Sequence, residues 1–554
     1  MKTWILRLNS VHQWRDSVPW LSTTKPISMP VLIGLLALYF GFGLNLPVVS
    51  QLVEQARATG VPIAGYASPL VLTLAFYLIF SLLAIPYLYR PIFSVLILSS
   101  SAAWYATTQY MVIFDYSMIE NIFETHSSEA AAYINSNSVF WFTLTGVLPT
   151  VWLWLVRVDH QPHWSSRLMR RGIGFSVAAF GLVLLAAMFY KDYAAIGRNN
   201  SHLNKWIVPT HVYYTVKYLN RTYFTEPLPF TTLGEDATLI EAANGKPNLI
   251  VLVVGETARA QNFRYNGYER DTNPYTADRD LIALQNVSSC GTSTAHSLPC
   301  MFSDLTRKQY NRREAVHRSN ALDILVTAGY HVQWIENDGG DKGIAKRVPL
   351  DTLSVDESHP HCDGSYCHDE ALLSDMESHI KDSATALVLH TIGSHGPTYY
   401  QRYPSSMARF TPACERSDIQ NCSDEEIVNV YDNTIVYTDY FLNLLIERLQ
   451  PFQATHNVKL MYISDHGESL GESGLYLHGT PYAFAPKEQT HIPWLMWFGE
   501  GAAEQNQWTD SCLQQQATTG NWSHDHFFHS LLDFASVKTQ VLESDMSFFK
   551  NCQS

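Results

Sequence analysis

Five long stretches without a charged residue dominate the first 190 positions and constrain the fold more than any other feature. A helix needs about 20 mostly apolar residues to cross a hydrocarbon core of about 30 Å. Buried helices of soluble domains rarely produce five such runs in succession, so the pattern predicts five membrane-spanning helices. The stretches are 29–49, 69–86, 91–113, 139–156 and 172–190.

The basic residues of this region predict the direction in which the helices cross. With the N-terminus inside, nine of the ten Lys and Arg residues in positions 1–190 fall on the inner side, and only Arg57 falls outside. Five crossings then place everything after residue 190 outside. Residues 1–28 are polar and precede a full-length span, which favours an uncleaved anchor over a removable signal peptide.

The remainder of the chain has a different composition. The formal net charge is −14, yet residues 1–190 are slightly basic, so the acidic excess lies entirely beyond them. An acidic chain is a poor partner for nucleic acid, whose phosphates need clustered Lys and Arg. The spans carry no charged residue, which favours an anchor over a transporter or channel.

All eight cysteines lie in the second half, where an oxidising compartment would allow disulfides. The pair Cys512 and Cys552 could form a further bridge, although spacing alone does not fix connectivity. A C-x4-C pair could instead bind a metal ion. The close pairs that short loops could join are Cys290 with Cys300, Cys362 with Cys367, and Cys414 with Cys422.

Composition divides the chain into three parts. Residues 1–190 are the predicted transmembrane anchor, and residues 248–554 are the predicted catalytic domain. Between them, residues 191–225 are rich in aromatic side chains, which fits either a helix lying in the membrane interface or an ordinary linker. Residues 226–247 read as the hinge into the second domain.

From residue 248 onward, short apolar runs alternate with helical stretches such as 424–449. Nearly continuous apolar strands indicate a sheet buried on both faces, as in parallel α/β domains. The motifs GETAR, END, TIGSHG and DHGES each follow one strand, and ligands of open α/β sheets bind beyond the carboxyl ends of strands. The predicted strands are 248–254, 331–335, 385–390 and 458–464.

The side chains at these strand ends predict a metal-assisted reaction. Carboxylates and imidazoles together are ligands that zinc accepts, and a hydroxyl bound to such an ion becomes a nucleophile. Nearby histidines could move a proton. These residues do not decide between phosphoryl and sulfuryl transfer. They are Glu256, His390, His395, Asp465, His466 and His478, with Thr292, Ser293 and Thr294 in a loop bracketed by cysteines.

Four ordered motifs resemble the membrane-bound phosphoethanolamine transferases, and most closely the lipid A-modifying branch that includes the mobile colistin-resistance enzymes. They are VVGETARAQNFRYNGYERDTNP (253–274), CGTSTAHSLPCMFS (290–303), HTIGSHGP (390–397) and SDHGES (464–469). The resemblance implies an N-terminal five-helix transmembrane domain in the bacterial inner membrane. It also implies a periplasmic C-terminal α/β domain of the alkaline phosphatase/sulfatase type.

The resemblance also implies roles for individual residues. Thr294 aligns with the nucleophile, and Lys342 with a basic residue at the substrate site. The family often has cysteines flanking that lysine, whereas Asp341 and Ala345 stand there in this chain. His395 and His478 match positions near the substrate phosphate or a second, weaker zinc, and His390 matches an active-site histidine. Ligands of the tightly bound zinc align with Glu256, Thr294, Asp465 and His466.

Asn121, Thr125 and Glu129 are spaced i, i+4 and i+8, which predicts one shared helix face. Their spacing resembles the loop with which the family helps to form its lipid substrate site. A solvated helix face without a ligand would show the same spacing.

The implied reaction has two steps and two lipid partners. Thr294 attacks the phosphorus of phosphatidylethanolamine, and a phosphate of lipid A then takes the phosphoethanolamine group, which weakens binding of cationic peptides such as polymyxin. The expected enzyme is a monomer. Alternatives are another envelope acceptor, a phosphodiesterase or sulfatase-like hydrolase, and a non-catalytic membrane sensor. The C/S-x-P-x-R context of sulfatases is absent around Thr294.

Overall fold

The computed structural model describes residues 25–58, 61–125, 127–159, 164–199, 201–550 and 552. The predicted inner residues Lys2, Arg7 and Arg15 lie outside the described residues. The chain forms two compact units, Met1–Asp115 with Ser136–Lys217, and Tyr116–Asn135 with Tyr218–Ser554. The segment between the third and fourth predicted spans therefore belongs to the same compact unit as the predicted catalytic domain.

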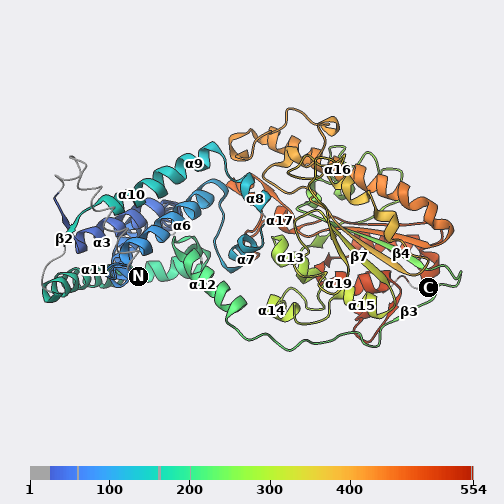
Figure 1. Cartoon of the computed structure of the whole chain (residues 1–554), viewed down its shortest axis with the longest axis horizontal. Helices are drawn as coiled ribbons and strands as arrows, with labels where there is room; N and C mark the ends of the chain where they lie inside the picture. Colours follow the sequence, from blue (N-terminus) through green and yellow to red (C-terminus); the bar gives the residue numbers. More distant parts are fainter. Residues whose placement is uncertain are drawn as a thin grey trace. The chain divides into compact units, whose positions relative to one another are not determined.

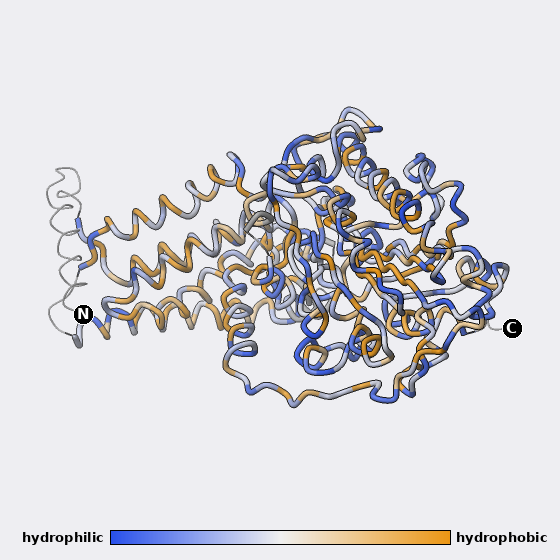
Figure 2. Tube along the Cα trace, turned by 45° about the vertical axis from the view of Figure 1, so that its right-hand side comes forward, coloured by the Kyte–Doolittle hydropathy of each residue, from blue (hydrophilic) through white to orange (hydrophobic). Residues whose placement is uncertain are grey.

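The first unit is helical, and its helices are hydrophobic over most of their length (Figure 2). Among the described residues, three helices are long and apolar enough to cross a membrane: Pro62–Leu83, Ser136–Leu155 and Trp164–Tyr193. A fourth span results if Met29–Leu44 and Leu46–Arg57, which meet at 62°, count as one. Helix α6 is long enough, but its serines and threonines lower its hydropathy. The count of five spans is therefore not confirmed.

The elements of the first unit follow the apolar stretches closely. The segment predicted as an interfacial helix or a linker is helical at α12, which ends in the second unit. The helices are α3 (Met29–Leu38), η1 (Tyr39–Leu44), α4 (Leu46–Ala58), α5 (Pro62–Leu83), α6 (Tyr89–Tyr110), α9 (Ser136–Phe142), η2 (Thr143–Val147), α10 (Leu148–Leu155), α11 (Trp164–Asn199), η3 (Ser201–Trp206) and α12 (Thr210–Tyr223), and the strands are β1 (Ile27–Ser28) and β2 (Val158–Asp159).

Small residues let these helices approach one another closely. A Cβ atom at Gly41 would lie 2.9 Å from the backbone nitrogen of Thr73, and one at Gly65 would lie 2.7 Å from the Cα of Val53. Between apolar helices, close backbone contact of this kind replaces the hydrophobic driving force that acts in water. The rings of Phe40 and Phe80, 5.0 Å apart, fill the neighbouring space.

A seven-stranded sheet organises the second unit. Its order is β5 (Ile282–Leu284), β13 (Trp494–Phe498), β10 (Asn457–Ser464), β4 (Asn248–Gly255), β9 (Thr385–His390), β7 (His331–Glu336) and β8 (Leu350–Thr352). The five strands from β10 to β8 run parallel, whereas β13 is antiparallel to both of its neighbours. The four predicted strands are confirmed, and they form the parallel centre of the sheet.

Helices cover both faces of this sheet (Figure 1). On one face, alternate strand residues such as Ile250, Leu252 and Val254 pack in one core with side chains of α13 (Thr294–Met301), α15 (Ala321–Thr327) and α19 (His524–Phe534). Helix α16 (Asp424–Leu449) lies on the other face, and a capping box of Ser423 and Glu426 fixes its start. The helix predicted over 424–449 is confirmed.

Short elements complete the second unit. They are α7 (Tyr116–Glu124), α8 (Ser127–Ala132), α14 (Arg312–Ala315), α17 (Lys487–Thr490), α18 (Asp510–Thr519), β3 (Thr238–Leu239), β6 (Val287–Ser288), β11 (Ser469–Leu470), β12 (Tyr476–Leu477), β14 (Trp522–Ser523) and β15 (Val537–Lys538). Strand β3 pairs with β15, β6 with β14 and β11 with β12.

All eight cysteines are paired in disulfides, and the three predicted short-range pairs are confirmed. The first bond joins Cys290 to Cys300 inside α13, and therefore closes the loop that carries Thr294. Another joins Cys414 to Cys422, the residue directly before the N-cap of α16. The fourth disulfide, between Cys512 and Cys552, ties α18 to the end of the chain.

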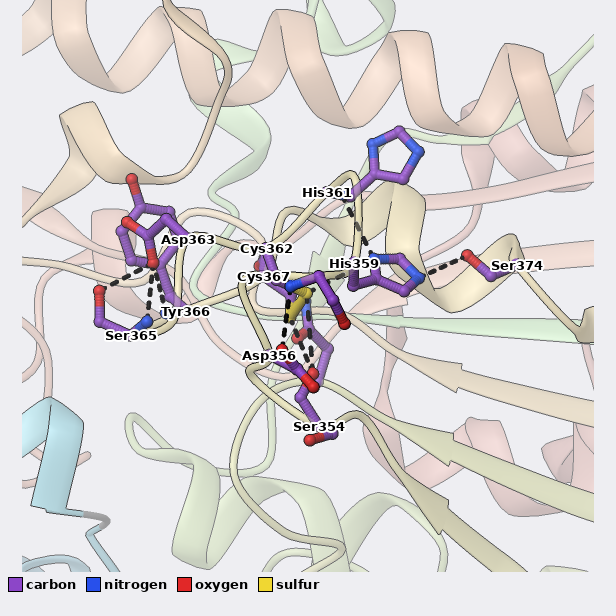
Figure 3. The surroundings of a disulfide bond; sticks show 12 residues. Ser354, Asp356, His359, His361, Cys362, Asp363, Ser365, Tyr366, Cys367 and Ser374 are labelled. Carbon is purple, nitrogen blue, oxygen red and sulfur yellow. Dashed lines mark hydrogen bonds between the residues drawn. A yellow bond between two sulfur atoms is a disulfide. The ribbon is translucent and has the colours of Figure 1, made fainter.

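The C-x4-C pair is the remaining short-range disulfide. Cys362 is bonded to Cys367, so this pair is not a metal site. Figure 3 shows the bond in a loop whose backbone turns around the carboxylate of Asp363, which accepts hydrogen bonds from Ser365 and Tyr366. The alternative of a metal bound by these two cysteines is therefore wrong.

Candidate active site

The buried ends of β4 and β10 bring the first functional residues together. Ser464 pairs with Gly255 in the sheet, so the residues that follow each strand meet at the same edge. These residues are Glu256, Asp465 and His466, which are all fully buried. Their donor atoms lie within 4.8 Å of one another. The strand-end rule therefore identified a convergent set of carboxylate and imidazole groups.

Unusual backbone conformations hold Glu256 in place. Thr257 has φ +57°, which lets its N–H donate to Asp465 Oδ1 at 3.1 Å. Gly393 in the TIGSHG turn has φ +49°, and a Cβ there would lie 2.7 Å from the carbonyl oxygen of Glu256. Only glycine fits both demands. The next residue, Ser394, donates its N–H to that same carbonyl oxygen at 3.0 Å.

Thr294 stands at the first position of α13 and faces this set. Its Oγ1 lies 3.2 and 3.1 Å from the two carboxylate oxygens of Glu256 and 3.4 Å from His466 Nε2. The N-terminus of a helix favours negative charge, which suits a hydroxyl that must lose a proton. Thr292 instead donates to the carbonyl of Thr480 at 2.7 Å, so it holds the loop.

The electrostatics of this set fit a divalent cation. Burial, and then the neighbouring carboxylate of Glu256, raise the pKa of Asp465 well above its usual range. Asp465 Oδ2 is buried and accepts no hydrogen bond from the described residues. Burial lowers the pKa of His466 to about 3, which leaves the neutral imidazole that binds metals. Two adjacent carboxylates and one neutral imidazole form a donor set suited to zinc.

His478 and His395 lie beside this set. The ring of His478 is 4.6 Å from that of His466 and 5.6 Å from that of His395. Glu468 orients His478 by a 2.9 Å contact between its Oε2 and Nδ1, and its other oxygen accepts a hydrogen bond from Tyr399. Sequence reasoning did not assign a role to Glu468, although this residue lies in the DHGES motif.

His390 ends β9 on the other side of Glu256. Its Nδ1 lies 3.0 and 2.9 Å from the two carboxylate oxygens of Glu336, the last residue of β7. Its Nε2 lies 3.7 Å from Asp338 Oδ2. Both acidic residues belong to the END motif, so their position at a strand end was visible in the sequence but their pairing with His390 was not.

The residues predicted to bind the lipid donor do not share one helix. Helix α7 ends at Glu124, and Glu129 lies in the separate helix α8, so the prediction of one shared face is wrong. Thr125 follows α7 directly, and its hydroxyl donates to the carbonyl of Asn121 at 2.8 Å. The helical run is therefore interrupted between Glu124 and Ser127. The side chain of Glu129 lies outside the described residues.

Arg312 joins α7 to the catalytic loops. Its guanidinium donates to Glu124 Oε1 at 2.5 Å and to the carbonyl of Ala295, directly after Thr294, and it lies 3.5 Å from Glu120. A weaker contact reaches the carbonyl of Lys342 at 3.4 Å. Burial raises the pKa of Glu120 to about 7, an effect that Arg312 opposes.

A cavity of about 530 Å³ opens next to the site. Its lining includes His395, Asp338, Tyr366 and Arg402. Ala132 of α8 contributes to the same wall. The cavity gives a polar substrate access to His395, whose ring lies next to that of His478.

The fold and this site together define a sulfatase-type α/β domain attached to a membrane-embedded helical part. The sequence model of the Sulfatase family matches residues 248–537, and the model described as Phosphoethanolamine transferase EptA/EptB matches residues 72–223.

Individual relatives make the assignment more specific. Phosphoethanolamine transferase EptA of Escherichia coli K12 is 37% identical over 94% of this chain and 96% of its own length. Phosphatidylethanolamine transferase Mcr-1 of Escherichia coli is 33% identical over 89% of this chain and 94% of its own length. The solved integral membrane lipooligosaccharide phosphoethanolamine transferase A of Neisseria meningitidis is 35% identical, with a TM-score of 0.91 over 96% of this chain and 100% of its own. The chain belongs to the EptA family of phosphoethanolamine transferases and is an integral membrane protein.

Proposed function

We propose that the protein transfers phosphoethanolamine from phosphatidylethanolamine to a phosphate of lipid A. The observation that carries this proposal is the Thr294 hydroxyl, held within hydrogen-bond distance of buried Glu256 at a helix N-terminus. The names of the relatives, including a Kdo(2)-lipid A phosphoethanolamine 7''-transferase of Salmonella typhimurium, support the choice of group and acceptor.

Zinc fits the site as a cofactor. Glu256, Asp465 and His466 would hold it together with Thr294, because their donor atoms converge and Asp465 Oδ2 has no hydrogen-bond donor among the described residues. When bound, zinc lowers the pKa of a coordinated hydroxyl and offsets charge on phosphoryl oxygens. The fit rests on the donor set, which is of the mixed carboxylate and imidazole type.

In the first step, Thr294 Oγ1 forms a bond to the phosphorus of the donor while the bond from phosphorus to the diacylglycerol oxygen breaks. The hydroxyl proton passes to Glu256, its hydrogen-bond acceptor. The leaving oxygen takes a proton from the imidazole pair His395 and His478, of which the second is oriented by Glu468. Phosphoethanolamine then remains on Thr294.

In the second step, a phosphate oxygen of lipid A attacks the same phosphorus, and its proton passes to the imidazole pair. Thr294 leaves and regains its proton from Glu256. The N-terminus of α13 faces the transferred group in both steps, and its dipole stabilises the negative charge that develops. The product carries less negative charge, so we expect weaker binding of polymyxin to cells that express the enzyme.

The proposed setting is the bacterial inner membrane, with five spans, the catalytic unit in the periplasm and a monomeric enzyme. Nine of ten basic residues on one side and four disulfides on the other support this orientation. Asn121, Thr125, Glu129 and Lys342 are the proposed contacts to the donor. Their positions support that role. Asn121 lies in α7, Thr125 follows it directly and Glu129 lies in α8. The carbonyl of Lys342 contacts Arg312, which also binds α7.

The test follows the group itself. Full-length protein in detergent is incubated with phosphatidylethanolamine labelled in its headgroup, and tryptic peptides are analysed for a phosphoethanolamine adduct on Thr294. Lipid A from cells expressing the same variants is analysed by mass spectrometry. We expect the adduct and the lipid A increment in wild type and in Thr292→Ala, which removes a hydroxyl two positions away.

Thr294→Ala is expected to lose both signals. Free phosphoethanolamine released to water without any lipid A increment would establish a hydrolase instead. An adduct on Thr294 with transfer to another envelope glycan would retain the chemistry and refute lipid A as the acceptor.

A further inference from the structure

The end of β9 holds a buried imidazole nitrogen that the proposed reaction does not use. His390 is fully buried, and its Nε2 has no hydrogen-bond partner among the described residues. An imidazole nitrogen left without a partner in a buried site needs a compensating ligand. The atom faces Asp338 Oδ2 at 3.7 Å, which is too long for a hydrogen bond.

Two carboxylates lie close to this nitrogen and complete a set of three possible metal ligands. Glu256, Asp338 and His390 offer ligand atoms that lie within 4.8 Å of one another. The sheet explains the convergence, because these residues follow or end the adjacent strands β4, β7 and β9, and His390 pairs with both Val254 and Glu336. Glu256 thus stands between two donor groups, with Asp465 and His466 on one side and Asp338 and His390 on the other.

A buried carboxylate orients the histidine in the way that metal-binding histidines are oriented. Glu336 contacts His390 Nδ1 at 2.9 and 3.0 Å, which leaves Nε2 as the free lone pair. Metal-ligating histidines usually donate their other ring nitrogen to such a carboxylate. Glu336 is itself held by Trp334 Nε1 at 2.8 Å and by the N–H of Asp338 at 2.6 Å, so the arrangement is rigid.

The balance of charge points the same way. Glu256, Asp465 and Glu336 are fully buried. Within the described part of the chain, the basic side chains that contact these three carboxylates are the histidines His466 and His390 rather than lysine or arginine. One divalent cation would leave an excess of negative charge in this interior, and buried charge without compensation is costly. A second divalent cation would remove that excess.

We propose that Glu256, Asp338 and His390 form a second divalent-cation site that shares Glu256 with the first. The site takes zinc through two carboxylates and one imidazole, and it binds more weakly because Asp338 is only partly enclosed. Glu336 and Asp338 both line the 530 Å³ cavity, which provides an entry path for the ion. An ion there faces the same space as a phosphate-bearing substrate.

This location differs from the imidazole pair that the family resemblance implied for a weaker zinc. In the described part of the chain, neither His395 nor His478 belongs to a group of three converging donors. The two locations therefore make opposite predictions for variants.

Metal counting tests the proposal directly. Full-length protein in detergent is stripped by a chelator and titrated with Zn²⁺ against a chromogenic competitor, and bound zinc is counted by mass spectrometry. A background of His359→Ala with His361→Ala removes two histidines of the loop in Figure 3 that could bind zinc adventitiously. We expect two equivalents, of which His390→Gln removes only the weaker. Retention of the tighter equivalent shows that this variant is folded.

Further variants separate the possible outcomes. Glu336→Gln is expected to weaken the second equivalent by about 10- to 100-fold, the usual cost of losing an orienting carboxylate. His395→Ala with His478→Ala is expected to keep both equivalents. A single equivalent in the His359→Ala/His361→Ala background, or two after His390→Gln is added to it, would overturn the proposal. Loss of the second equivalent only in the His395/His478 variant would place the ion at that pair instead and refute it equally.

Discussion

Arg312 is the residue whose removal tests the link between α7 and the catalytic loops most directly. Its side chain is 20% exposed, and its partners Glu120 and Glu124 are 5% and 19% exposed. Arg312→Ala leaves two carboxylates in a poorly solvated site without their cation. Breaking a buried ion pair from one side costs about 3–5 kcal/mol, and we take about 3 kcal/mol because the site is partly open.

The expected change in melting temperature follows from this free energy and the number of residues in the second unit. Unfolding entropy is about 2.1 cal/mol/K per residue, so a unit of roughly 350 residues loses about 4 °C for 3 kcal/mol. The assay is thermal unfolding of the full chain in detergent, followed by tryptophan fluorescence. Arg313→Ala is the matched control, because the side chain of Arg313 makes an exposed contact to the carbonyl of Glu226, and we expect a change below about 0.5 kcal/mol.

A triple variant tests whether the unpaired carboxylates cause this destabilisation. If unpaired carboxylates cause the loss, then adding Glu120→Gln and Glu124→Gln to Arg312→Ala should restore most of the melting temperature. Equal destabilisation in the single and the triple variant would show that Arg312 acts through packing and its hydrogen bond to Ala295, and the electrostatic reasoning would be refuted.

Three further predictions concern separate parts of the second unit. Burial raises the pKa of Glu120 to about 7, so its stabilising contribution is full below about pH 4.5 and is lost as the pH rises through 7. In denaturant unfolding, Glu120→Gln should therefore gain roughly 3 kcal/mol relative to wild type at pH 8 and little at pH 4. An unchanged pH profile in that variant would contradict this assignment. Gly393→Ala should lower the zinc content and the free energy of unfolding, the latter by about 1–3 kcal/mol. The control Gly267→Ala, also at positive φ but with open space around its Cβ, should cost about 1 kcal/mol and keep the metal. Equal zinc content in the two variants would show that the close approach of Gly393 to Glu256 does not matter. Replacing Cys512 and Cys552 by serine opens a loop with a sequence separation of 40. The free energy of reversible unfolding should fall by about 4 kcal/mol. A loss near zero would mean that core contacts alone hold the end of the chain.

The sequence predicted the parallel centre of the sheet and its reactive edge. Strands buried on both faces read as continuous apolar runs, and the polar residue after each run is then forced to one edge. This logic located Glu256, Asp465 and His466 without any contact information. It did not predict β13 (Trp494–Phe498), whose run is as apolar as those of the parallel strands but which pairs antiparallel with β10 and β5.

Other features needed long-range contacts. Arg312 meets Glu124 across 188 positions, and neither residue carries a local signal of that pairing. The break between α7 and α8 was also hidden, since a spacing of four residues is equally compatible with one helix or two short ones. The contact that orients His478 joins it to Glu468, ten positions earlier, through a turn whose path the sequence pattern does not predict.

The amino-acid sequence by itself determined which chemistry this protein can carry and at which strand ends it stands, because apolar runs and the residues after them are local properties. Only the tertiary structure decided which of those ionisable side chains lie next to one another. It placed Glu256 between two donor groups, left Nε2 of His390 without a hydrogen bond from the described residues, and set Arg312 against α7. Such pairings depend on distances between elements far apart in the chain, which periodicity and motif spacing do not encode.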